Sequence, residues 1–426
     1  MENIESVGSH FYILNIFYVL IFAFLFWIAY IKIMYPFWNT QPVFHSYDFW
    51  RYWARVPFII RKKKGLKPDK FCDFENIVTM NFLDMPTEYI CQMVDFLQCN
   101  YIHDESVLFL FHSENLSAYF AGHLIPSYVS FYMGTHNGIH TSLGDSDGGS
   151  GVNLVQKKRI DACITSRNIL LKYGGDNANA SGMNVYFMDF IALRRGGNIA
   201  CSRKLMATHC WHTLGFSGAS GENIKGAIFR KEGEPFPGIR AFLRFDANMY
   251  RIEGVTNPAL PFHFVLTSIH ADNAWILTEF LENSYGNMDG FFAMTSISNL
   301  VELVKMRVLF IYLIQRADSV FCLYIFRDTR CQYELNSRAM LQLVCSIQKS
   351  NSSELFYCGF LNAIHDILKS RLGKAFGYLM VDDVADNSLI VENFPSSAFL
   401  EKTEVNYYAY NMVMPTVNNK KAWIIL

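Results

Sequence analysis

The sequence has no excess of charge of either sign and no cysteines paired in the way that holds metals. Its 426 residues carry 37 lysines and arginines against 38 aspartates and glutamates, so the net charge is -1. The basic residues are scattered apart from a group at 51–64, and no electrostatic surface for nucleic acid is predicted. The ten cysteines include no CxxC pair, which favours reduced, buried thiols over a disulfide framework or a zinc site.

Signatures of several enzyme classes are also missing. Walker-type phosphate loops and dinucleotide fingerprints do not occur. The segment 215–221 places two serines between glycines but misses the GxSxG spacing of a nucleophile elbow. The two histidines of the run 209–212 would put only two ligands on one helix face, and no second cluster completes a tetrahedral set. The sequence therefore predicts no metal site.

A long apolar stretch without charge lies near the N-terminus. Residues 11–31 contain no charged side chain, and about 20 residues that rise 1.5 Å each cross a hydrocarbon core of about 30 Å. Glu2 and Glu5 precede it, where a cleavable signal peptide would have basic residues. Lysines and arginines follow it, so the positive-inside bias predicts a luminal or outer N-terminus at 1–10 and a cytosolic main domain. The sequence thus predicts a single-pass membrane protein that contacts lipid through residues 11–31; a buried core helix is the alternative.

The chain after this stretch is long and rich in apolar side chains. Hydrophobic residues make up 51% of the sequence and aromatic residues 16%. About 390 residues exceed what one hydrophobic core usually holds, so two packed domains or a double-size fold are expected. The spacing of apolar residues predicts helices at 83–99 and 360–372 and a hairpin at 308–326. Strands are predicted at 375–381, 405–413 and 422–426, so that the chain would end inside a sheet.

One strand–loop–helix segment has the features of an anion site. Residues 183–193 form a nearly continuous apolar run with a single acid, Asp189, which is typical of a strand buried on both faces. A glycine-bearing turn and a helical pattern follow, and the backbone N–H groups at such a helix start bind phosphate. The pattern Arg195-x-x-Asn198-x-Ala200 matches the acetyltransferase signature Arg/Gln-x-x-Gly-x-Gly/Ala, with Asn for the first glycine. An ordinary strand-to-helix turn is the alternative.

Four islands of sequence, in a fixed order and spacing, point to one family. Residues 35–43 read Tyr-Pro-Phe-Trp-Asn-Thr-Gln-Pro-Val, and residues 100–111 form a partly acidic segment. Residues 189–193 lead into the turn described above, and residues 407–426 contain a Tyr-Tyr-Ala-Tyr-Asn run and an apolar end. From about residue 35 onward the chain resembles N-myristoyltransferase, the two-lobed family with the acetyltransferase fold. There the islands correspond to a Phe-Trp-Asp-Thr-Gln-Pro-Val motif, the acidic loop over the peptide groove, the thioester- and pyrophosphate-binding strand and turn, and the C-terminal strand pair.

The resemblance implies a fold and a division of the chain. It predicts an α/β (α+β) protein in which two acetyltransferase-like (GNAT-type) lobes form one saddle-shaped sheet with flanking helices. Residues 35–250 would form the lobe that binds acyl-CoA, and residues 251–426 the lobe that binds the acceptor. The donor substrate would be a myristoyl-type acyl-CoA, without a metal, and the acceptor a protein or peptide with an N-terminal glycine.

The resemblance also implies roles for individual residues. The N–H groups of Phe190 and Ile191 would polarise the thioester carbonyl, and the carboxylate of the last residue, Leu426, would accept the amine proton. Residues implied to hold acyl-CoA are Pro36, Phe37, Trp38, Ala192, Leu193, Arg195, Gly196, Gly197, Asn198, Ile199 and Ala200. Residues implied to contact the acceptor are Asp189, Asp104, Glu105, Phe109 and Phe111.

Three positions on the acceptor side depart from the family pattern. Asp189 replaces an Asn, Ile224 a Thr and Leu243 a His. Each lost hydrogen-bonding group would weaken acceptor binding by about 1 to 3 kcal/mol. The carboxylate of Asp189 would hold an ammonium or act as another base, unless it is a strand residue capped by a neighbour.

The sequence therefore predicts an N-acyltransferase that moves a fatty acyl group from acyl-CoA to an N-terminal glycine by direct attack. Two alternatives stay open. One is a catalytically inactive structural or interaction protein of a membrane, and the other is an acyltransferase with a non-peptide amine acceptor.

Overall fold

The computed structural model describes most of the chain in fourteen segments. These are residues 2–34, 42–44, 53, 56–62, 68, 70–102, 106–138, 155–174, 182–214, 224–285, 290–333, 338–349, 351–370 and 376–426.

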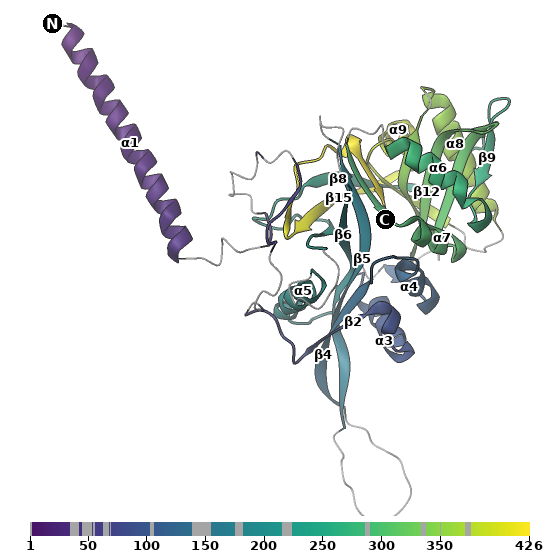
Figure 1. The fold of residues 1–426 in the computed structure, drawn as a ribbon. Helices are drawn as coiled ribbons and strands as arrows, with labels where there is room; N and C mark the ends of the chain where they lie inside the picture. Colours follow the sequence, from purple (N-terminus) through teal and green to yellow (C-terminus); the bar gives the residue numbers. More distant parts are fainter. Residues whose placement is uncertain are drawn as a thin grey trace, which may run out of the picture.

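The first helix, α1 (Glu2–Met34), stands apart from the other elements (Figure 1). Within the described segments, no helix is both long enough and apolar enough to span a bilayer. The prediction of a single-pass membrane protein with a transmembrane segment at 11–31 is therefore wrong. The lipid contact and the membrane topology predicted from this segment are not supported. A buried core helix is not observed either, because the described side chains of α1, those of residues 14–30, are exposed except for the half-buried Ile28.

The described elements between residues 58 and 251 include both strands and helices. The strands are β1 (Phe58–Ile59), β2 (Ile77–Asn81), β3 (Val107–Phe109), β4 (Tyr128–Gly138), β5 (Val155–Tyr173), β6 (Met183–Leu193), β7 (Ala227–Glu232) and β8 (Leu243–Arg251). The helices are the 3-10 turn η2 (Phe82–Asp84), α3 (Thr87–Asn100), α4 (Ser113–Phe120) and α5 (Ile199–Thr213).

The described elements after residue 251 are again both strands and helices. The strands are β9 (Val265–Ser268), β10 (Phe291–Thr295), β11 (Leu309–Arg316), β12 (Ser319–Tyr333), β13 (Arg338–Gln348), β14 (Phe376–Asp382), β15 (Phe399–Tyr410), β16 (Met412–Val413) and β17 (Ala422–Ile425). The helices are η3 (Ala271–Asn273), α6 (Ala274–Tyr285), α7 (Ile297–Lys305), α8 (Ser353–Lys369), α9 (Asn387–Asn393), η4 (Ser396–Ala398) and η5 (Asn419–Lys421).

Most strands of the described chain join one mixed sheet of 15 strands. Its main order is β17-β10-β5-β6-β7-β15-β8-β14-β13-β12-β11-β9, with β2, β3 and β4 attached at its side. β5 and β6 are antiparallel, whereas β6 with β7, and β13 with β14, are parallel. Strands of the C-terminal half enter the N-terminal half, because β10 pairs with β5 and β15 lies between β7 and β8. The predicted mixed α/β architecture is confirmed; the division at residue 250 stays a prediction.

Helices cover both faces of β5 and β6 (Figure 1). On one face, Leu205 and Cys210 of α5 pack with Ile164 and Met188. On the other face, α3 and α4 belong to a large cluster that also contains Phe190. Because side chains of a strand alternate between its two faces, successive residues of β5 and β6 enter two separate cores.

Several predicted elements appear where the sequence placed them. β6 spans the predicted run 183–193, α3 lies within one to four residues of the predicted helix, and β11 with β12 forms the predicted hairpin. β17 pairs with β10, so the chain ends inside a sheet as predicted. α8 begins before the predicted Phe360, because the Ser352 side chain accepts a hydrogen bond from the Leu355 N–H at 3.1 Å and starts the helix there.

Candidate active site

Strand β6 contains a bulge at the predicted thioester site. The register leaves one residue of β5 opposite two residues of β6, Phe190 and Ile191. Phe190 has a φ of 46°, a left-handed conformation that is rare for a bulky residue. A bulge redirects backbone groups out of the ladder and is common beside active sites.

Side chains of β5 fix this bulge from one side. The Thr165 hydroxyl donates to the Asp189 carbonyl at 2.8 Å, and the Cys163 thiol donates to the Phe190 carbonyl at 3.3 Å. The Phe190 N–H donates to Oδ1 of Asp189 at 2.9 Å. Of the two N–H groups predicted to polarise a thioester, that of Phe190 therefore has a carboxylate partner, whereas Ile191 lies in the bulge with an exposed side chain.

The other carboxylate oxygen of Asp189 faces an arginine. Nη2 of Arg167 lies 3.8 Å from Oδ2 of Asp189, with the arginine side chain 0% exposed and the aspartate side chain 16% exposed. Burial lowers the pKa of the Arg167 guanidinium, and the Asp189 charge opposes this shift. Arginine at this position was not predicted from the sequence. The available signal was a single charge within the apolar stretch 162–171.

Aromatic rings surround the bulge. The Phe190 ring lies 5.3 Å from Phe111, 5.4 Å from Tyr119 and 5.6 Å from Tyr101, measured between centroids. Phe109 stacks on Phe111 at 5.0 Å, and both are buried. These two predicted acceptor contacts are thus brought to the bulge, where they form part of the core next to it.

The turn after β6 has the predicted strand–loop–helix geometry. The Asn198 side chain caps α5 by accepting a hydrogen bond from the Ala200 N–H at 2.9 Å, and residues 195–200 are exposed. The Arg195 N–H donates to the Asn100 side chain and the Gly197 N–H to the Arg194 carbonyl. Ala192 is buried and Leu193 half-buried at the end of the strand. Exposed backbone at a helix start is a suitable place for a phosphate.

The two arginines of this turn are both engaged. Nε of Arg194 lies 2.7 Å from Oδ1 of Asp161, and its guanidinium also donates to the Ile160 carbonyl. The Arg195 guanidinium donates to the Ile102 carbonyl at 3.0 Å. Backbone groups near Gly196, Asn198 and Ile199, rather than free arginine side chains, are what this turn offers to an anion.

The last residue of the chain is enclosed. Leu426 is 4% exposed and packs with Ile169 and Phe291. Since β17 pairs with β10 up to Ile425 and Met294, Leu426 is level with the end of β10. The predicted catalytic residue Leu426 thus lies buried beside the ends of β17 and β10.

A chain of hydrogen bonds connects the two halves of the sheet. The Arg327 guanidinium donates to Oε1 of the Gln342 side chain at 3.1 Å, and Nε2 of the same side chain donates to the Asp382 carboxylate at 3.0 Å. Arg230 donates to the same Asp382 carboxylate at 2.7 Å. Burial alone would lower the pKa of Arg230, but the charges of Asp382 and Glu232 raise it well above its usual value. These residues come from four different strands, and no local pattern in the sequence joins them.

Five predicted site residues lie outside the described part of the chain. They are Pro36, Phe37, Trp38, Asp104 and Glu105. Of the departures from the family pattern, Ile224 and Leu243 are both buried in the core.

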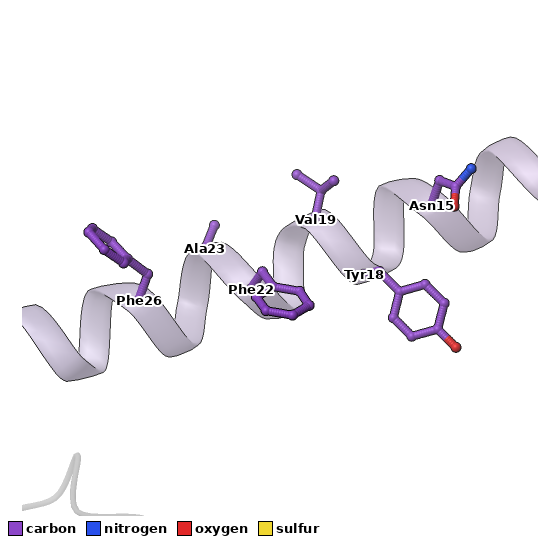
Figure 2. A pocket seen from close by; sticks show the side chains of 6 residues that line it. All are labelled: Asn15, Tyr18, Val19, Phe22, Ala23 and Phe26. Atoms are coloured by element: carbon purple, nitrogen blue, oxygen red, sulfur yellow. The ribbon is translucent and has the colours of Figure 1, made fainter.

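Two hollows lie away from the bulge. One follows a single face of α1 and is lined by residues from Asn15 to Phe26 (Figure 2). Because one exposed helix forms all of it, this hollow has no opposite wall. The other, of about 510 Å³, lies between the start of α4 and the strands β11, β12 and β14. Neither contains a predicted site residue.

Comparison with known proteins identifies the fold. No family model and no curated protein sequence matches the chain. A crystal structure of Saccharomyces cerevisiae N-myristoyltransferase with bound myristoyl-CoA is similar, with a TM-score of 0.63 and 10% identity over 92% of this chain and 94% of that chain. A second structure of the yeast enzyme with myristoyl-CoA gives a TM-score of 0.60 and 11% identity over 92% and 99% of the two chains.

A third yeast structure, with myristoyl-CoA and inhibitors, has a TM-score of 0.61 and 11% identity over 91% and 94% of the two chains. Identities this low show the fold alone. The resemblance predicted from the four islands is confirmed at that level: this chain has the N-myristoyltransferase fold over nearly its whole length.

Proposed function

We propose that this chain is an N-acyltransferase that moves a fatty acyl group from acyl-CoA to the N-terminal amine of a glycine-headed protein or peptide. The observation that carries the proposal is the bulge at Phe190 and Ile191, which lies directly before the exposed turn that starts α5. The yeast enzymes with this fold were crystallised with myristoyl-CoA, which supports a long-chain acyl-CoA as the donor.

In the proposed reaction the amine nitrogen attacks the carbonyl carbon of the thioester. A C–N bond forms as the C–S bond breaks, and coenzyme A leaves as a thiolate that takes up the proton lost by the amine. The Ile191 N–H would donate to the developing oxyanion, joined by that of Phe190 when the Asp189 carboxylate turns away. The pyrophosphate would lie against the backbone of residues 196–199 at the start of α5.

The terminal carboxylate of Leu426 is the proposed carrier of the amine proton. An α-carboxyl group is ordinarily ionised at neutral pH and can orient an amine and accept its proton. Its burial at the end of β17 supports this role, because a base that must act at one point cannot lie on a frayed end.

The test is an assay of acyl transfer from a long-chain acyl-CoA to a glycine-headed peptide. Two quantities are measured, the release of free CoA thiol and the mass of the peptide. An N-acetylated peptide is the control. Adding two glycines after Leu426 should lower turnover at least 100-fold while the melting temperature stays within a few degrees. Full activity of the extended chain would contradict the role of the terminal carboxylate, and no thiol release with any acyl-CoA would contradict the proposed function.

A second candidate function has one observation in its favour. The Phe190 N–H is already hydrogen-bonded to Asp189, so a thioester would have to displace a carboxylate from the oxyanion site. A protein that binds acyl-CoA without transferring it would tolerate this bond. Calorimetric binding of a long-chain acyl-CoA without thiol release would favour this candidate.

A further inference from the structure

The hollow of about 510 Å³ lies where the first turn of α4 meets the strands β11, β12 and β14. Its volume is within the range of about 300 to 1,000 Å³ that is usual for ligand sites. Three apolar side chains, Met306, Phe310 and Phe376, form part of the wall, and charged and amide side chains from α4 and β12 form the rest. None of these residues is part of the proposed acyl-transfer site, so a ligand here is distinct from the acyl donor and the acceptor.

Arg330 of β12 brings a guanidinium with spare donors to this hollow. Its side chain is 11% exposed, and Nη1 lies 3.4 Å from Oδ2 of Asp328. Nη2 donates to the Arg307 carbonyl at 3.3 Å, whereas Nε is buried and has no hydrogen-bond partner among the described residues. Both contacts are longer than the roughly 2.7–2.9 Å of a charge-assisted hydrogen bond. The guanidinium can therefore donate to an anionic group in the hollow.

Asn115 of α4 contributes an acceptor without a donor. The residue is 6% exposed, and its Oδ1 is buried with no hydrogen-bond partner in the described part of the chain. A buried acceptor that stays unsatisfied is costly, and a ligand N–H that donates to Oδ1 removes that cost. Since Arg330 and Asn115 line the same hollow, a ligand that satisfies both has an anionic group next to an N–H.

The charges of the wall favour one negative charge on the ligand. The ionisable side chains there are Arg307, Arg330, Asp328, Glu114 and His112. Asp328 is engaged, because its Oδ1 accepts from the Arg330 N–H at 2.9 Å and its Oδ2 faces the guanidinium. The start of α4 adds partial positive charge, since its N-cap, His112, makes no side-chain hydrogen bond to the helix. Glu114 in the first turn opposes this, and it opposes a phosphate dianion more strongly than a carboxylate.

We propose that this hollow binds the C-terminal end of a partner protein whose last residue is apolar. The terminal carboxylate accepts hydrogen bonds from Arg330 and from the first N–H groups of α4, and the N–H of the last residue donates to Oδ1 of Asn115. The last side chain packs on Phe310 and Phe376. This chain's own C-terminus is not the ligand, because Leu426 is buried at the end of β17.

The experiment is calorimetric titration of the full chain with an N-acetylated hexapeptide of glycine and serine that ends in leucine. The acetyl group removes the amine, so this peptide is not an acyl acceptor. The free acid should bind at least 20-fold more tightly than the C-terminal amide, which lacks the charge. N-methylation of the last peptide bond should weaken binding at least fivefold, because it removes the donor to Asn115. No binding of the acid, or equal affinity of acid and amide, would overturn the proposal.

Two variants test the wall of the hollow. Asn115→Leu removes the orphaned acceptor at similar size, so the Kd of the acid peptide should rise at least fivefold while the melting temperature holds or increases. Glu114→Gln removes an opposing charge from an exposed position, and the Kd should fall two- to fivefold. An unchanged Kd in Asn115→Leu, or weaker binding in Glu114→Gln, would contradict the assigned contacts. Both variants should retain any acyl transfer, so the outcome here is independent of the proposed function.

Discussion

Two Arg–Asp pairs join β5 to β6, and they differ in almost every physical respect. Arg194 and Asp161 lie 2.7 Å apart, with side chains 26% and 21% exposed, beside the turn that would hold the donor. Arg167 and Asp189 lie 3.8 Å apart, with side chains 0% and 16% exposed, beside the bulge that would hold the acceptor. The first pair has a charge-assisted hydrogen bond between two partly exposed side chains, whereas the second has no such bond and its arginine is fully buried. An Arg–Asp pair can thus stabilise the fold at one site, whereas a pair of the same residue types costs free energy at another site because its charges are buried.

The difference between the two pairs is tested most directly by changing each aspartate to asparagine. Asp189→Asn leaves Arg167 buried without a counter-charge and should lower the free energy of unfolding by about 3 to 5 kcal/mol, measured by urea denaturation. Arg167→Met in the same chain should recover most of this loss, because an apolar side chain of similar length needs no partner. A loss below about 1 kcal/mol would show that Asp189 does not compensate Arg167.

The opposite face of the same strands provides a pH test. His209 of α5 is buried, its Nδ1 lies 2.8 Å from the Ser130 hydroxyl, and burial lowers its pKa to about 3. The unfolded chain binds this proton below about pH 6.5, whereas the folded chain does not until about pH 3, so stability falls as the pH falls. Between pH 6.5 and 4.5 the loss should be roughly 2 to 3 kcal/mol.

The control for this pH dependence is His209→Gln, which carries no proton in this range. The loss assigned to His209 is the difference between the slopes of the two proteins in urea denaturation. Identical slopes from pH 6.5 to 4.5 would contradict it. Arg167 stays charged throughout this range, so the two buried basic side chains can be told apart by pH alone.

A smaller loss of stability is expected at the turn proposed to hold acyl-CoA, where the helix cap joins residues that are close in the sequence. Asn198→Ala removes the side-chain cap on the Ala200 N–H and should cost about 1 kcal/mol of stability. Asn198→Ser keeps an uncharged side-chain acceptor for this N–H and is the matched control. The KM for acyl-CoA should rise several-fold in the alanine variant while the Kd of the acceptor peptide stays unchanged. A change in the Kd of the peptide without a change in the KM for acyl-CoA would contradict the assignment of this turn to donor binding.

The smallest loss of stability is expected at the partly exposed pair of Arg194 and Asp161. Asp161→Asn breaks the partly exposed contact with Arg194 and should cost only about 0.2 to 1 kcal/mol, since water solvates the freed guanidinium. Denaturation at low and high salt checks this, because screening weakens an exposed pair and should narrow the gap between variant and wild type. A loss as large as that of Asp189→Asn would remove the contrast between the pairs.

The sequence by itself determined the elements whose signals are local. The apolar run 183–193 predicted β6 to the residue, and the pattern after the glycine-bearing turn predicted a helix, which is α5. The apolar end of the chain predicted a terminal strand, and the four islands predicted the fold that the comparisons confirm. Periodicity and caps act over a few residues, so the sequence contains them in full.

Only the tertiary structure decided how the site is charged. Arg167 meets Asp189 because the register of two strands, joined through a long connection, pairs Thr165 with Asp189 and leaves the bulge beyond it. The rings of Tyr119 on α4 and Phe187 on β6 lie 5.5 Å and 5.3 Å from the Arg167 guanidinium. Neither the register nor these approaches has a local signature, since each depends on which side chains fill the space between distant elements. A charge placed in an apolar strand was visible in the sequence, but its partner was not.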